Sequence, residues 1–139
     1  MKRLLLAAEK GDARSQFNLG VLHDNRLDDN EYPIENDRKG AIKWLLKAAQ
    51  QGLPRAQSRL AQIYASGPET SEDIIKACTW FILATTSLSG IHRQMAQSGY
   101  ERISSQMTPA QIAEATRHAK NWKPKSQDDV ATGSSPENS

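Results

Sequence analysis

The chain has 139 residues, of which 37% are hydrophobic, and its 18 basic and 16 acidic side chains leave a formal net charge of +2. This length suits one domain of ordinary size, and no apolar run approaches the ~20 residues that span a bilayer. The single cysteine, Cys78, excludes an intramolecular disulfide framework and any multi-cysteine metal site. A charge surplus this small does not indicate a nucleic-acid binder.

The N-terminus begins like a signal peptide, with Met-Lys-Arg followed by three leucines and two alanines in residues 1–8. Its apolar stretch is shorter than the roughly 7–15 residues of a signal core, and charged residues follow at once. We therefore interpret residues 4–10 as the end of a helix of the folded protein. The expected compartment is the cytoplasm, or the periplasm or exterior if the chain is a processed fragment.

The sequence repeats internally. The segment 7–11, Ala-Ala-Glu-Lys-Gly, recurs as Ala-Ala-Gln-Gln-Gly in 48–52, an offset of 41. A second series matches Asp37, Ala41 and Trp44 to Asp73, Ala77 and Trp80 at an offset of 36. The difference indicates an insertion after Leu19, and a repeat of about 36 residues is typical of two-helix solenoid units.

Hydrophobic periodicity and capping signals predict further helices in residues 12–25, 36–51, 53–66, 71–87, 92–105 and 108–122. In 92–105 the expected core stripe is Met95, Gly99 and Ile103. The last helix has the sequence Thr-Pro-Ala-Gln at 108–111, which offers a capping hydroxyl and a glutamine three residues later. Polar composition without periodicity predicts a disordered tail in 126–139.

These residues resemble Sel1-like repeats, which are relatives of the tetratricopeptide solenoids. The family pattern combines an Ala-Ala-x-x-Gly turn, a helix with Leu-Gly-x-x-Tyr, and a helix with Asp-x-x-x-Ala-x-x-Trp. The second copy supplies Ala48, Ala49, Gly52, Ala56, Leu60, Ala61, Tyr64, Gly67, Asp73, Ala77 and Trp80. His23 replaces the expected Tyr in the first copy. The segment 107–115 resembles the closing helix common in bacterial members.

The resemblance implies an all-α fold, a right-handed α-solenoid of antiparallel helix pairs with about seven helices. The solenoid would occupy residues 1–125, with a C-terminal capping helix at 108–122. It also implies a non-enzymatic module that binds a protein or peptide partner on the concave face, without a cofactor. By analogy with tetratricopeptide positions, the partner-binding residues would be Arg14, Phe17, Val21, Arg55, Ser58 and Gln62.

Phe17 has two interpretations. If it is exposed beside the arginines, it would suit an extended peptide that carries an acidic or C-terminal carboxylate. Alternatively, Phe17 packs against the neighbouring helix and has only a structural role.

A hydrolase or a small-ligand-binding protein on the same scaffold is the alternative function. The three histidines have no i, i+4 spacing, so they form no metal-binding pair. Cys78 is expected to be a buried, inert thiol. Some cysteine-rich Sel1-like proteins bind or hydrolyse β-lactams, but their paired cysteines and a Ser-x-x-Lys motif are missing here. We therefore expect neither catalytic residues nor a metal site.

Two features have no assigned role. The inserted loop at 24–37 is rich in acids, including Asp28, Asp29 and Glu31, and is either a recognition element or a solvated loop. Leu4, Leu5 and Leu6 would expose part of a repeat interface, because the chain opens midway through a unit. The expectation for that end is self-association, docking of a partner, or continuation into a longer array of which this chain is a fragment.

Overall fold

The computed structural model describes residues 2–24, 38–66 and 70–126. This part of the chain contains seven helices and no strand, in agreement with the expected all-α class. It divides into two compact units, one of Met1–Ala56 with Pro124–Ser139 and the other of Gln57–Lys123. Apart from Asp24 and Ser126, the predicted acidic loop and the predicted tail lie outside the described residues.

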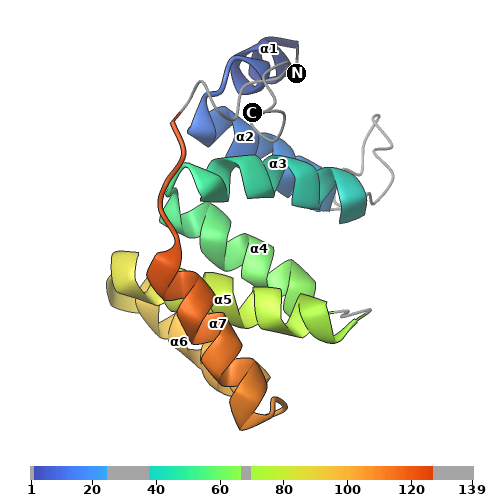
Figure 1. Ribbon diagram of the computed structural model, residues 1–139. Coiled ribbons are helices and arrows are strands. Elements are labelled where there is room, and N and C mark those ends of the chain that lie inside the picture. Colours follow the sequence, from blue (N-terminus) through green and yellow to red (C-terminus); the bar gives the residue numbers. More distant parts are fainter. Residues whose placement is uncertain (1, 25–37, 67–69, 127–139) are drawn as a thin grey trace. The chain divides into compact units, whose positions relative to one another are not determined.

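The helices follow the sequence expectation within a few residues (Figure 1). The starts differ from the predicted ones by at most two residues; α6, for example, begins at Gly90, two residues before the predicted position. The seven helices are α1 (Lys2–Glu9), α2 (Ala13–Asp24), α3 (Arg38–Gln50), α4 (Pro54–Ser66), α5 (Ser71–Ser87), α6 (Gly90–Ser104) and α7 (Pro109–Asn121).

The repeated Ala-Ala-x-x-Gly segment forms the same turn after α1 and after α3. Gly11 and Gly52 have φ angles of 99° and 96°, a conformation that costs a non-glycine residue. The N–H of each glycine donates to the carbonyl three residues earlier, at 3.0 and 2.9 Å. The next N–H reaches back five residues, at 3.1 and 3.3 Å. This is the Schellman arrangement, which satisfies the last carbonyls of each helix.

In the first unit, α2 packs against both α1 and α3. Its core cluster consists of Ala8, Leu19 and Trp44, with Leu4 packed beside it. Gly20 permits the close approach of α3, because a Cβ built there would lie 2.5 Å from Leu45 Cγ. The repeat tryptophan Trp44 is 5% exposed and therefore belongs to the core.

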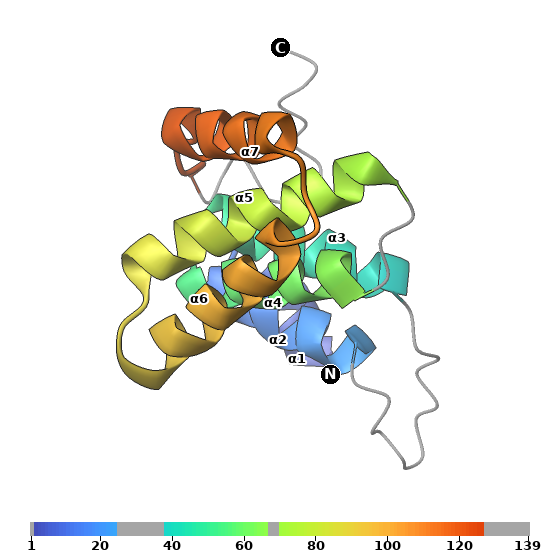
Figure 2. The ribbon, with the colours of Figure 1, turned by 90° about the horizontal axis from the view of Figure 1, so that it is seen from below.

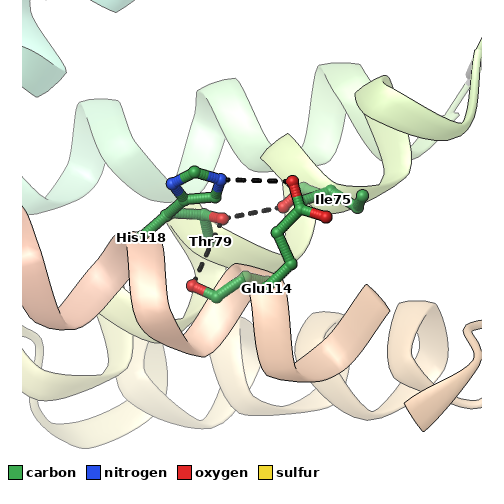
Figure 3. A network of polar contacts seen from close by, with 5 residues as sticks. Ile75, Thr79, Glu114 and His118 are labelled. Atoms are coloured by element: carbon green, nitrogen blue, oxygen red, sulfur yellow. Dashed lines mark hydrogen bonds and ion pairs between the residues drawn. The ribbon is translucent and has the colours of Figure 1, made fainter. Parts of the chain in front are cut away.

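In the second unit, α6 and α7 both pack against α5 (Figure 2). Trp80 of α5 meets Trp122, the residue after α7, edge to face, with ring centroids 6.1 Å apart. The Thr79 hydroxyl donates to the Ile75 carbonyl at 2.8 Å and lies 3.5 Å from the Ala115 carbonyl of α7 (Figure 3). The closing helix is therefore joined to the repeat tryptophan and to the middle of α5.

The predicted core stripe of α6 was wrong at one position. Met95 is 53% exposed, whereas its neighbour Ala96 is buried together with Gly99 and Ile103. The physical reason is the contact between Gly99 and the Phe81 ring, which leaves no room for a Cβ. This close contact turns the small residues of α6 toward α5, and Met95, one position before Ala96, lies on a neighbouring face.

Candidate interaction sites

The first candidate site, which we call the arginine face, consists of Arg14, Phe17 and Arg55 in the first unit. Arg14 and Arg55 are exposed and Phe17 is half-buried. The Arg55 guanidinium carbon lies 5.5 Å from the centroid of the Phe17 ring. That distance is within the range of about 6 Å for a cation–π contact. The first turn of α4 thus covers part of Phe17 with a charged group, and part of the ring stays accessible.

The other predicted contact residues differ in their exposure. Val21 is half-buried on α2, one turn beyond Phe17. Ser58 is only 8% exposed, so the expectation that its side chain contacts a partner needs correction. It lies on the buried side of α4, next to Gln57, which is 2% exposed. Gln62 is half-buried on α4, in the second unit. The structure therefore brings Phe17 and Arg55 into contact and places Gln62 in a different site.

That second site is a hollow of about 450 Å³ between α4, α5 and α6, which we call the α6 hollow. Phe81 and Gly99 lie at the α5–α6 contact, and among the described lining residues Arg102 supplies the one charged group. The described residues that line it are Gln62, Ala65, Ser66, Phe81, Met95, Ser98, Gly99, Arg102, Ile103 and Gln106.

Sequence reasoning predicted only Gln62 among these lining residues. A signal was present, because residues 95, 98 and 102 recur at helical spacing and share one face of α6, and residue 106 follows just after the helix. Of this face, the sequence analysis considered only Met95, which it assigned to a core stripe with Gly99 and Ile103. The hollow depends on which face of α6 turns toward α5, and this is decided by the contact of Gly99 with Phe81.

The histidines form no catalytic arrangement in the described residues. His23 is half-buried on α2, and His92 is exposed at the start of α6. His118 Nε2 lies 3.4 Å from Glu114 Oε2, one turn earlier on α7 (Figure 3). Both side chains of this pair are largely exposed, as is usual for i, i+4 pairs on a helix surface.

Cys78 has the properties of a structural thiol. It is fully buried on α5, and burial raises the pKa of its thiol to about 11 from the usual 9.0. The thiolate, which is the nucleophilic form, is therefore disfavoured near neutral pH. Among the described residues no three His, Cys, Asp or Glu side chains are grouped to hold a metal ion. Nor does any helix in this part of the chain have the length and apolarity needed to cross a membrane.

Comparison with known proteins identifies the repeats. The family model of the Sel1 repeat matches residues 13–53 and 54–86, which together make up more than half of the chain. No curated protein and no solved structure matched in the corresponding searches. Sel1 repeats imply a helical solenoid like that of tetratricopeptide proteins, generally mediate protein–protein interactions and are typically non-catalytic. With two consecutive repeats over most of α2 to α5, the chain belongs to the Sel1 repeat family.

Proposed function

We propose that the protein is a non-enzymatic adaptor that binds a peptide or protein partner through the arginine face. The observation that carries this proposal is the Arg55 guanidinium over the Phe17 ring, with Arg14 one helical turn before Phe17. Two exposed guanidinium groups beside a half-buried aromatic ring combine charge with apolar contact area. Such a combination suits an extended segment that carries a carboxylate.

Electrostatics gives this face its selectivity. Guanidinium groups form bidentate hydrogen bonds with carboxylates, which a lysine cannot reproduce. Phe17 adds apolar contact area, so a segment with both an apolar side chain and a carboxylate should bind more tightly than a purely acidic segment. An exposed ion pair is screened by salt, so binding through this face should weaken as ionic strength rises.

The test is capture of partners from a lysate of the source cells, followed by mass spectrometry. We expect the double variant Arg14→Glu/Arg55→Glu to capture at least tenfold less of the partner than the wild-type protein does. The reason is that both carboxylate-binding groups are then replaced by groups that repel a carboxylate. Circular dichroism should show unchanged helix content, because both positions are exposed.

A matched control is the double variant Arg93→Glu/Arg117→Glu, which makes the same change of net charge at exposed positions on α6 and α7. This protein should retain the partner. Equal retention by the two double variants would contradict the arginine face as the binding site.

A further inference from the structure

We propose that the α6 hollow is a second binding site, for an extended peptide segment with an apolar side chain and an acidic side chain about three residues apart. The site lies wholly within the second unit, and the proposal does not rest on the arginine face. A hollow of about 450 Å³ is in the size range of ligand sites, which usually bind through apolar walls with a few polar groups.

The apolar part of the site lies around Met95. Its side chain is 53% exposed, and it lines the hollow together with Phe81 and Ile103. Ile91, one turn earlier on α6, is 65% exposed and extends the apolar strip beyond the hollow. Methionine is flexible and polarizable, so it adapts to aliphatic side chains of different shape. This end of the hollow therefore fits an aliphatic anchor residue.

The charged part of the site is Arg102. It is exposed, and no carboxylate among the described residues pairs with it. The preceding residue, Glu101, instead accepts a hydrogen bond from Gln97 Nε2 at 3.3 Å, on another face of α6. A guanidinium that has no carboxylate partner in the described part of the chain, at the edge of an apolar hollow, is complementary to a carboxylate of the bound segment.

Glutamine side chains are positioned to hold the backbone of the segment. Gln62 on α4 and Gln106 just after α6 both line the hollow. A glutamine amide both donates and accepts, so it can pair with the N–H and C=O of an extended chain. Gln106 lies one turn beyond Arg102, so the lining continues past the guanidinium. This favours an acidic side chain within the segment over a terminal carboxylate.

Helix geometry sets the spacing of the two recognised side chains. Met95 and Arg102 are separated by two helical turns on the same face, or about 10 Å at 1.5 Å per residue. A chain in the polyproline conformation, which rises about 3.1 Å per residue, covers that distance in about three residues and has every third side chain on one side.

Fluorescence anisotropy with synthetic peptides tests the proposal on the full chain. The probe is a labelled, C-terminally amidated peptide of alanine and glutamine with one leucine and one aspartate three positions later. Exchange of its aspartate for asparagine should weaken binding at least tenfold, and exchange of its leucine for serine should do the same. A third peptide, with asparagine in place of the aspartate and a free terminal carboxylate at its end, should bind no better than the asparagine peptide.

Variants locate the site. Arg102→Gln should bind the aspartate and asparagine peptides equally, and Met95→Gln should bind both more weakly than the wild type does. Arg93→Gln, an exposed arginine on the same helix and outside the α6 hollow, should keep the full discrimination. The Arg14→Glu/Arg55→Glu protein should also keep it, so the two proposals fail independently.

Three results would overturn the proposal. The first is no binding of the aspartate peptide up to millimolar concentration. The second is a preference for the aspartate peptide over the asparagine peptide that persists in the Arg102→Gln protein. Loss of this preference to the same extent in the Arg93→Gln protein would count equally against the proposal. The third is equally tight binding of the peptide whose only carboxylate is terminal, which would reassign the recognised group.

Discussion

At the scale of single residues, small side chains decide how closely the helices pack. Gly20 faces Leu45 of α3, and Gly99 faces the Phe81 ring of α5, with no space for a methyl group at either position. Leu45 is fully buried and Phe81 is 2% exposed, so neither side chain can move out into solvent. The two glycines therefore set the distance between α2 and α3 and between α5 and α6.

Gly20→Ala should lower the free energy of unfolding by about 1–2 kcal/mol. Overpacking costs about 1–3 kcal/mol, and the better helix propensity of alanine returns up to about 1 kcal/mol. Urea denaturation followed by circular dichroism measures the change. Asn18→Ala, at an exposed position of the same helix, is the control and should be neutral or slightly stabilising. A Gly20→Ala protein as stable as that control would contradict the packing argument.

At the scale of elements, local sequence fixes where most helices begin and end. The Thr108 hydroxyl accepts a hydrogen bond from the Gln111 N–H at 3.1 Å, and Gln111 Oε1 accepts one from the Thr108 N–H at 2.9 Å. This reciprocal capping box was predicted from four residues of sequence and is confirmed. The start of α7 therefore required no tertiary information.

Thr108→Ala should destabilise α7 by about 1 kcal/mol, because the Gln111 N–H loses its acceptor. Thr108→Ser keeps a capping hydroxyl and should behave like the wild type within a few tenths of a kcal/mol. Hydrogen exchange of the α7 amides, measured by mass spectrometry, reports the effect where it occurs. Faster exchange of equal size in the serine variant would show that the hydroxyl is not the cause.

At the scale of the whole molecule, the near-neutral charge conceals local differences. The described helix α3 carries Lys39, Lys43 and Lys47 at i, i+4 spacing. Partial burial, and then the charge of Lys43, lower the pKa of Lys47. Positive charge is therefore concentrated along this helix. The acid-rich loop predicted at 24–37 lies, apart from Asp24, outside the described residues.

The N-terminal leucines of α1 are the side chains through which we expect the protein to self-associate. Leu4 packs beside the first core cluster, whereas Leu5 and Leu6 are 38% and 54% exposed. We expect the molar mass from light scattering to rise with protein concentration, because these side chains offer an apolar contact. The double variant Leu5→Ser/Leu6→Ser should stay at the monomer mass. A wild-type protein that is strictly monomeric at high concentration would contradict self-association through α1.

The sequence by itself determined the repeat, the helices with their turns, and the buried tryptophans. Each of these depends on residues close together in the chain: a glycine with positive φ after two alanines, a threonine three residues before a glutamine, or a 3.6-residue period.

Only the tertiary structure decided which face of α6 is buried. Periodicity placed Met95 in the core, but the close contact of Gly99 with Phe81, 18 residues apart in sequence, turned it toward the α6 hollow. The arginine face is an intermediate case, because the resemblance to tetratricopeptide positions predicted its residues but not the stacking of Arg55 on Phe17. The physical reason is that helix propensity and capping are local energies, whereas the exposure of a side chain depends on the helix packed against it.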